Sequence, residues 1–212
     1  MNLSELEQHC CEYVSVVVPA DAGHDIGHVR RVVRNVAWLT AEESADAWVT
    51  LPAAWLHDCV AIAKDSPLRS RGSQLAAEAA VQFLQSLDYP AGKLPEVAHA
   101  IEAHSFSAAI ATRSLEAQVV QDGDRLDSLG AIGIARCLLV GGKLNRPLFA
   151  LDDPFCEQRE PDDGKYTIDH FYNKLFKLPA MMQTRAGKAE AERRANIMRA
   201  YLDELSAEIT PS

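Results

Sequence analysis

The spacing of the apolar residues constrains the fold of this 212-residue chain more than any other feature. Apolar side chains recur at three- and four-residue intervals almost everywhere, and the alternation of a half-buried strand is hard to find. Residues 25–42 show the pattern, because Ile26, Val29, Val33 and Val36 fall on one stripe of a helix. The sequence therefore predicts an all-α fold, a compact single-domain bundle of roughly eight or nine helices.

Capping and breaking residues indicate where the helices begin and end. Ser4, Ser73 and Thr167 are expected helix caps, and polar loops are expected at 62–72 and 143–166. The composition does not shift enough along the chain to divide it into domains. The expected helices cover residues 4–17, 25–42, 46–61, 73–87 and 95–104, a segment from Ser114 through VVQDGDRLDSL, and residues 167–178 and 184–207.

The charge balance limits the class of partner. Lys and Arg number 21 against 30 Asp and Glu, a formal net charge of −9. We expect no broad basic face of the kind that binds a nucleic-acid polymer. A small phosphorylated substrate is still compatible with this charge, because a metal ion or a few local cations can reverse the sign of the field inside a pocket.

The cysteine pattern and the hydropathy give an expected location. The five cysteines include no C-x-x-C pair, so no disulfide framework or zinc ribbon is expected. The start, MNLSELEQHCCEY, lacks the pattern of a signal peptide, and no segment approaches the ~18 apolar residues of a membrane span. We expect a reduced cytoplasmic protein without a membrane partner. Either a monomer or a homodimer is compatible with the apolar GAIGIARCLLVGG segment.

Four residues are not explained by core packing alone. His28 lies near the start of the second expected helix, His57 and Asp58 end the third, and Asp124 lies within QDGDRLD. Their nitrogen and oxygen atoms are those of a mixed metal site. Ligands from several helices would leave positions of an octahedral ion open for water and substrate, as hydrolysis requires.

A purely structural explanation is also available for each of these residues. A single His often serves only as a hydrogen-bond partner, and Asp124 has Arg125 close by for an ion pair. Asp58 is harder to explain in this way, since it lies in the apolar run Ala-Trp-Leu-His-Asp-Cys-Val. An unpaired charge there would cost several kcal/mol, so it requires a cation or several donors.

The motifs resemble those of the HD-domain metal-dependent phosphohydrolases, whose signature is H…HD…D on a helical bundle. The segments GHDIGHVRRVVRNV, LPAAWLHDCV, AIEAHSFSA and VVQDGDRLDSLGAIGIAR carry the resemblance. Together with DHFYNKLFKL they are similar to the small stand-alone bacterial branch of the superfamily. The resemblance implies an HD core over about 20–130, with C-terminal helices over about 167–207 packing on it in one domain.

The resemblance also implies the ligands and the ion. A single divalent ion would be held by His28, His57, Asp58 and Asp124, with Asp122 as the alternative last ligand. Such a ligand set accommodates Mn²⁺, Fe²⁺, Co²⁺, Ni²⁺ or Zn²⁺, whereas Mg²⁺ is less suited to histidines. Expected supporting residues that orient the helix and the ligands are Asp122, Arg125 and Asp127.

Cationic and polar groups near these motifs are candidates for phosphate contact. The loop after the HD pair contains Lys64, Arg69 and Arg71, which could close over an anion, although loop cations are usually only solvated. The weaker candidates are His104, for which a helix-ending role is an alternative, and Lys174 and Lys177.

The expected reaction is hydrolysis of a phosphate ester or anhydride by a water that the metal activates. Asp58 would both bind the ion and hold the water. Some HD enzymes place an acidic residue within four positions of the HD pair, but here Cys59, Val60, Ala61 and Ile62 follow. The candidate general bases are therefore Asp65 and Glu102.

The stand-alone members suggest a nucleotide substrate, and a nucleoside triphosphate pyrophosphohydrolase is preferred. The alternatives are a nucleoside monophosphate phosphatase or another phosphomonoesterase or phosphodiesterase. An alternative of a different class is a catalytically inactive regulatory protein that binds a metal or a nucleotide. Release of phosphate or pyrophosphate separates the enzymes from that alternative.

Overall fold

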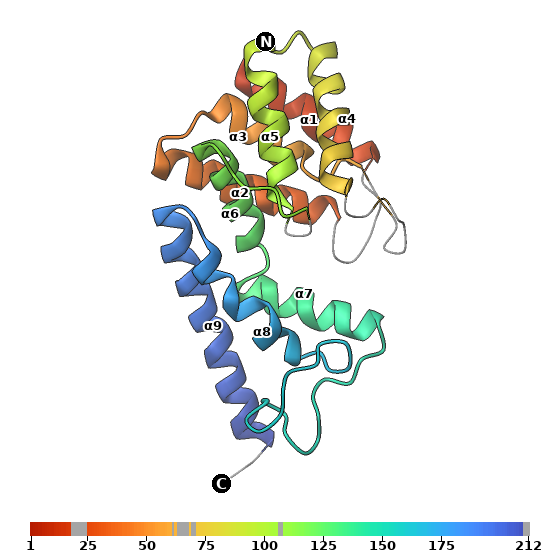
Figure 1. Cartoon of the computed structure of the whole chain (residues 1–212), viewed down its shortest axis with the longest axis vertical. Coiled ribbons are helices and arrows are strands. Elements are labelled where there is room, and N and C mark those ends of the chain that lie inside the picture. The colour runs from red at the N-terminus through yellow and green to blue at the C-terminus, as the bar shows by residue number, and fades with distance from the viewer. Residues whose placement is uncertain (18–24, 61, 63–67, 69–70, 106–107, 210–212) are drawn as a thin grey trace. The chain divides into compact units, whose positions relative to one another are not determined.

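The described part of the chain is helical and contains no strand. The computed structural model describes residues 1–17, 25–60, 62, 68, 71–105 and 108–209, in which nine α-helices and three short 3-10 helices are present (Figure 1). The all-α prediction is confirmed. Within these ranges each helix is either too short or too polar to cross a membrane.

The chain divides into two compact units, which are described separately. The first comprises Met1–Asp124 and Gln183–Gly187, and the second Arg125–Met182 and Lys188–Ser212. The first unit contains α1 (Leu3–Val17), α2 (Ile26–Glu43), α3 (Ala47–Leu56), α4 (Gly72–Ser86), η2 (Ala91–Lys93), α5 (Leu94–His104) and most of α6 (Leu115–Leu126). The second contains α7 (Gly130–Lys143), α8 (Asp169–Asn173), η3 (Leu175–Lys177), η4 (Pro179–Met181) and most of α9 (Arg185–Ile209).

The core of the first unit is built around α3. This helix is apolar on every side, and its residues from Val49 to Leu56 are all buried. It packs against α1, α2 and α5. The carboxylate of Asp46 accepts the Trp48 N–H and so caps the start of α3, while the carboxylate of Asp25 does the same for α2 through the His28 N–H. A fully buried helix is thereby fixed at one end, and the HD pair follows at its other end.

Several expected helix boundaries differ from the structure. The helix expected at 46–61 ends at Leu56, where a tightened turn joins the Cys59 N–H to the Leu56 carbonyl oxygen. Ser73 was expected to cap α4, but Arg71 occupies the cap position, and the buried Ser73 hydroxyl has no hydrogen-bond partner among the described residues. A helix was expected to begin near Ser114, and this residue caps α6, because its hydroxyl accepts the Ala117 N–H.

The segment expected to form one helix over 167–178 is broken into α8, η3 and η4. Thr167 does not cap a helix with its side chain, because its hydroxyl donates to the Pro147 carbonyl oxygen. Phe171, Leu175 and Leu178 have the spacing of one apolar stripe of a helix, and all three are buried. Burial of that stripe in the second unit therefore does not require one continuous helix.

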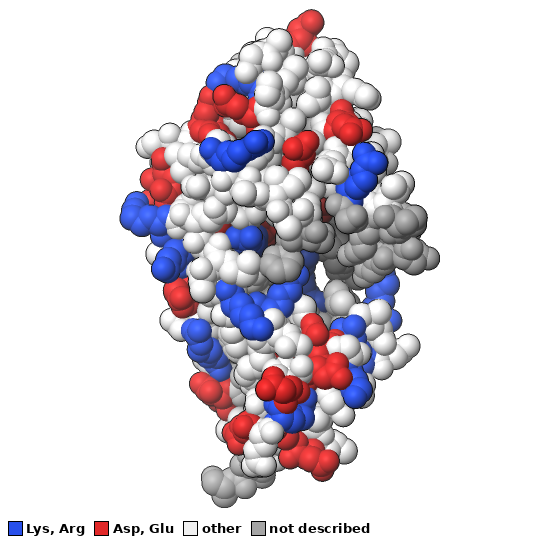
Figure 2. All heavy atoms as spheres, in the orientation of Figure 1, with Lys and Arg blue, Asp and Glu red and all other residues white. Residues whose placement is uncertain are grey.

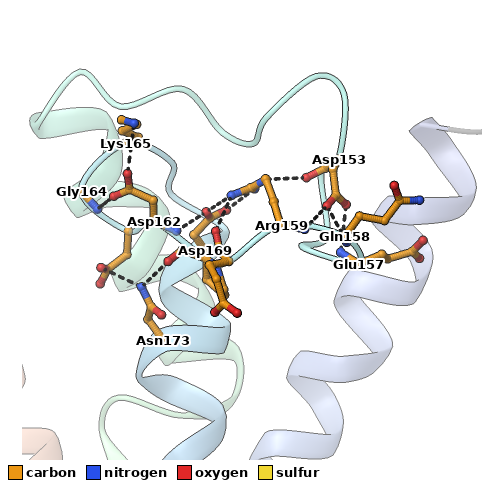
Figure 3. A network of polar contacts seen from close by, with 12 residues as sticks. Asp153, Glu157, Gln158, Arg159, Asp162, Gly164, Lys165, Asp169 and Asn173 are labelled. Carbon is orange, nitrogen blue, oxygen red and sulfur yellow. Dashed lines mark hydrogen bonds and ion pairs between the residues drawn. The ribbon is translucent and has the colours of Figure 1, made fainter.

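A polar network organises the loop before α8 (Figure 3). Asp169 is fully buried, and its two oxygens accept both terminal nitrogens of Arg159, at 2.5 and 2.8 Å, and the Asp162 N–H. The Asp153 carboxylate accepts the backbone N–H groups of residues 157–159. Asp163 contacts His170 Nδ1 at 2.7 Å and the Asn173 amide at 3.0 Å. Each oxygen of these three carboxylates faces a nitrogen of the same unit.

Charged side chains are mixed in sign on the visible surface. Figure 2 shows Lys and Arg interspersed with Asp and Glu within each unit on the face that it presents. The expected lack of binding to a nucleic-acid polymer stays a prediction.

Candidate metal centre

The groups that the sequence singles out meet in the first unit. His28 lies in the first turn of α2, His57 and Asp58 lie in the turn after α3, and Asp124 lies in the last turn of α6. His28 Nε2 is 3.5 Å from Asp124 Oδ1 and 3.4 Å from His57 Nε2. His57 Nε2 is 3.4 Å from Asp58 Oδ2. The structure thus brings together all four residues named from the sequence.

Hydrogen bonds to backbone carbonyl groups orient two of the imidazole rings. His57 Nδ1 lies 2.8 Å from the Ala54 carbonyl oxygen, and His104 Nδ1 lies 2.6 Å from that of Ile101. A carbonyl oxygen only accepts, so each Nδ1 carries the hydrogen. In the neutral ring Nε2 then presents a lone pair, and this is the state in which imidazole binds a metal ion.

When these rings are neutral, the centre contains acceptors that face other acceptors. His28, His57 and Asp58 each offer one ligand atom, and these atoms lie within 4.8 Å of one another. Both histidines are 1% exposed, whereas the Asp58 and Asp124 side chains are partly exposed. Protons or a cation would make such a cluster favourable. The donor set of imidazole nitrogens and carboxylate oxygens fits a divalent transition-metal ion.

The protein's charges make the centre attractive to cations. Desolvation by burial lowers the pKa of His57, but Asp58 and Asp124 outweigh it and raise the pKa to about 9. A proton on His57 is thus stabilised by the same carboxylates that would stabilise a metal ion. Metal binding must displace that proton.

His104 extends the cluster on the far side of Asp58. Its Nε2 is 3.6 Å from Asp58 Oδ1, and its ring stands nearly perpendicular to that of His57 with the centroids 4.9 Å apart. His57 and His104 are built alike, each ending a helix and each bonded through Nδ1 to a carbonyl group three residues earlier. One oxygen of Asp58 therefore faces His57 and the other faces His104.

The QDGD sequence in α6 makes a different contact at each residue. Gln121 donates to the Ala103 carbonyl oxygen, directly before His104. Gly123 packs so closely on α2 that a Cβ atom there would lie 2.4 Å from Cγ2 of Val36. The side-chain amide of Asn35 on α2 also donates to the carbonyl oxygen of Gly123 at 3.0 Å. Gln121 and Gly123 thus fix α6 against α5 and α2.

Asp122 is fully buried and faces other partners. Its oxygens accept the Gln183 N–H, and one of them also accepts the Thr184 N–H and hydroxyl at 2.8 Å. Successive helix residues turn by about 100°, so Asp122 and Asp124 point about 200° apart. The geometry favours Asp124 over Asp122 as the fourth ligand.

Some candidates lie near or outside the residues that the structure describes. Lys64, Asp65 and Arg69 are outside the described residues. Arg71 is exposed at the start of α4. Glu102 is half-buried on α5, and its negative charge acts on His99. The proposed roles of these five residues stay predictions.

The remaining candidates belong to the second unit. The Arg125 guanidinium donates to the Met181 carbonyl oxygen at 2.6 Å, and the buried Asp127 pairs with Arg136 at 2.8 Å. These contacts are internal to that unit and explain both residues structurally. The side chains of Lys174 and Lys177 are exposed. Their expected phosphate contact stays a prediction.

Sequence reasoning missed the segment that holds Asp122. Gln183 donates to Gln121 through its amide and accepts the Thr112 hydroxyl, in addition to its backbone bond to Asp122. A threonine before a helix was the one local signal, and it predicts a cap rather than a link to α6. Such a contact between residues 62 positions apart has no signature in a single sequence.

Comparisons with known proteins give the family. Residues 25–129 match the model of the HD domain. The protein YpgQ of Bacillus subtilis is 30% identical over 98% of this chain and 95% of its own length. An HD-superfamily hydrolase from Bacillus thuringiensis superposes with a TM-score of 0.78 and 31% identity over the full length of both chains.

Two further solved structures are similar over the same extent. A protein of Lactobacillus plantarum superposes with a TM-score of 0.76 and 32% identity over all of both chains. A structure of YpgQ in complex with ADP superposes with a TM-score of 0.76 and 27% identity, covering 100% of this chain and 98% of YpgQ. HD domains bind divalent metals, and the His28, His57 and Asp58 cluster is present here. The chain therefore belongs to the HD-domain superfamily and is, in general terms, a metal-dependent phosphohydrolase.

Proposed function

We propose that this protein hydrolyses a nucleoside triphosphate to the monophosphate and pyrophosphate, using one divalent ion bound by His28, His57, Asp58 and Asp124. The observation that carries the proposal is the convergence of metal-binding atoms from several helices: the ligand atoms of His28, His57 and Asp58 lie within 4.8 Å of one another, and Asp124 Oδ1 lies 3.5 Å from His28 Nε2. The complex of the relative YpgQ with ADP supports a nucleotide as the ligand.

The ligand set indicates which ions to test. Two imidazoles and two carboxylates suit Mn²⁺, Fe²⁺, Co²⁺, Ni²⁺ or Zn²⁺ better than Mg²⁺. A bound ion would lower the pKa of a water and neutralise charge that accumulates on the phosphoryl oxygens. The exposed fractions of the Asp58 and Asp124 side chains, 33% and 28%, leave the cluster open on the side of these carboxylates.

Asp58 and His104 have the geometry to orient the attacking water. Asp58 Oδ1 and Nε2 of a neutral His104 are acceptors 3.6 Å apart, and a water that lies beside both would donate one hydrogen to each. The Nδ1–H bond to the Ile101 carbonyl oxygen keeps the His104 lone pair pointed at this position. His104 is thus proposed to contact the reacting group directly, in line with its predicted role in substrate binding.

Cations would hold the rest of the substrate. Lys64, Arg69 and Arg71 follow the HD pair in the chain and are the proposed phosphate contacts, while phosphate contact by Lys174 and Lys177 stays a separate prediction. Several cationic side chains suit a triphosphate, since a hydrogen bond from a charged donor to a phosphate oxygen is stronger than one between neutral groups. Asp65 and Glu102 remain the proposed candidates for the general base.

The test is product analysis over a nucleotide panel. Triphosphates, diphosphates and monophosphates are incubated with Mn²⁺, Co²⁺, Mg²⁺ or no added metal, and phosphate and pyrophosphate are measured separately. We expect pyrophosphate and monophosphate from triphosphates, with Mn²⁺ or Co²⁺ above Mg²⁺. The His57→Ala, Asp58→Ala double variant should be inactive, whereas Asp88→Asn, an exposed change in the same unit, should match wild type.

Each other outcome overturns part of the proposal. Release of phosphate from monophosphates alone identifies a nucleoside monophosphate phosphatase instead. Binding of nucleotide and metal without any release identifies a regulatory binding protein. Equal release by the double variant removes the activity from this site.

A further inference from the structure

A distant segment of the chain holds the helix that carries Asp124. The segment Gln183–Gly187 belongs to the first unit although it follows more than fifty residues of the second. The N–H groups of Gln183 and Thr184, together with the Thr184 hydroxyl, all donate to the buried Asp122 carboxylate. The same hydroxyl accepts the Gly187 N–H, so it also caps the first turn of α9.

The fit around Asp122 leaves little freedom. A Cβ atom at Gly187 would lie 2.7 Å from Asp122 Oδ2 and 2.5 Å from the Thr184 hydroxyl oxygen, so the backbone approaches as closely as a glycine allows. The Ala186 N–H in addition donates to Glu43, at the end of α2, at 2.6 Å. The segment is therefore tied to both α6 and α2, the two helices that supply Asp124 and His28.

These contacts determine how α6 is rotated about its axis. Asp122 and Asp124 point about 200° apart on the helix. Holding Asp122 against Gln183 and Thr184 turns Asp124 toward His28, which lies 3.5 Å from it. The close packing of Gly123 on Val36 fixes the distance between α6 and α2 but does not replace this rotational restraint.

We propose that the contact of Gln183 and Thr184 with Asp122 sets the metal affinity of the centre, with Asp122 and Thr184 as positioning residues. The inference rests on the assignment of Asp124 as a ligand in the proposed function. Residues that orient metal ligands typically change metal affinity by about 10- to 100-fold when they are replaced. Asp122 acts through the helix and does not touch the ion.

The experiment measures Mn²⁺ binding by calorimetry and the metal-free melting temperature of each variant. Asp122→Asn keeps the shape of the side chain but places an amide where donors already converge, and we expect about a tenfold or larger loss of Mn²⁺ affinity. Thr184→Val removes one donor and should weaken binding severalfold. Thr184→Ser restores the hydroxyl and should restore affinity to within about twofold of wild type.

Asp46→Asn is the matched control. Asp46 also accepts a backbone N–H at the start of a helix and pairs with Lys93, but it lies at the end of α3 opposite to His57. This variant should lower the metal-free melting temperature while leaving Mn²⁺ affinity unchanged. If the two variants lower the metal-free melting temperature equally but Asp122→Asn weakens Mn²⁺ binding more than Asp46→Asn does, Asp122 acts as a positioning residue.

Two results separate this inference from the proposed function. If Asp124→Asn loses Mn²⁺ binding but Asp122→Asn and Thr184→Val keep wild-type affinity, the positioning role is wrong and the ligand assignment stands. If Asp124→Asn binds Mn²⁺ as wild type does, the ligand assignment itself is wrong, and the positioning role fails with it.

Discussion

Two regions of this protein gather carboxylates, and the groups that face these carboxylates differ in kind. In the loop before α8, Asp169 is fully buried and accepts the two terminal nitrogens of Arg159 and a backbone N–H (Figure 3). In the cluster after α3, Asp58 faces the Nε2 atoms of His57 and His104, which present lone pairs when these rings are neutral. In the loop, donors of the chain itself satisfy the carboxylate. In the cluster, we expect a metal ion to join the carboxylate and the imidazoles.

The difference explains why residue type alone does not identify a site. The loop region contains Asp153, Asp162, Asp163 and Asp169 and is as acidic as any part of the chain. Its carboxylates are satisfied by donors of the chain itself, so they stabilise the loop. Imidazole nitrogens and carboxylate oxygens that converge from several helices are the stronger indication of metal binding.

The largest expected effect is at the cluster around Asp58. Asp58→Asn removes a charged ligand and places an amide beside His57 and His104. We expect hydrolysis to fall by about a thousandfold or more and Mn²⁺ no longer to raise the melting temperature. Steady-state kinetics and thermal melts with and without Mn²⁺ check both. If Mn²⁺ raised the melting temperature of Asp58→Asn as much as that of wild type, Asp58 would not be a metal ligand.

A large effect on stability alone is expected at Asp169 in the network before α8. Asp169→Asn leaves the Arg159 guanidinium without its buried carboxylate. Breaking such a pair costs about 3 kcal/mol or more in the free energy of unfolding. Denaturant unfolding measures this loss, and Mn²⁺ affinity should stay within about twofold of wild type. Loss of Mn²⁺ affinity in this variant would mean that the loop network also serves the centre.

A smaller effect is expected from acid. Burial raises the pKa of Asp169, but its hydrogen bonds with Arg159 and the Asp162 N–H outweigh burial, and the pKa lies below its ordinary value. The hydrogen bond with His170 likewise lowers the pKa of Asp163. Carboxylates with a lowered folded pKa stabilise the protein above their unfolded pKa of about 4. That stability is lost as the pH falls through the folded pKa. The unfolding free energy measured between pH 6 and pH 3 should fall, and by less in Asp169→Asn.

The smallest effect is expected at the surface of the same loop. Lys165 pairs with Asp162 at 3.4 Å, and their side chains are 73% and 47% exposed. An exposed pair of this kind contributes about 0–1 kcal/mol, so Lys165→Ala should change the unfolding free energy by less than about 0.5 kcal/mol. A change as large as that of Asp169→Asn would show that burial does not decide the strength of the network.

The sequence predicted the helices and the ligand candidates better than the contacts that hold them. His28, His57 and Asp58 were found because their residue types are out of place in apolar helices, and helical periodicity gave α2 and α9 closely. The long-range partners were not predictable, since the bond between Asp122 and Thr184 leaves no local pattern. The break of the expected 167–178 helix was also missed, because the buried residues Phe171 and Leu175 have the spacing of one continuous helix although the structure divides this segment into α8, η3 and η4.

The metal content of the first unit tests the account most directly. Titration of metal-free protein with Mn²⁺, followed by calorimetry, should give one bound ion per chain, with proton release that varies with pH because His57 must lose its proton. Asp58→Asn should abolish the binding, and Asp169→Asn should leave it intact. Absence of Mn²⁺, Co²⁺ and Zn²⁺ binding by the wild-type protein, or equal binding by Asp58→Asn, would contradict the claim that this cluster is a metal centre.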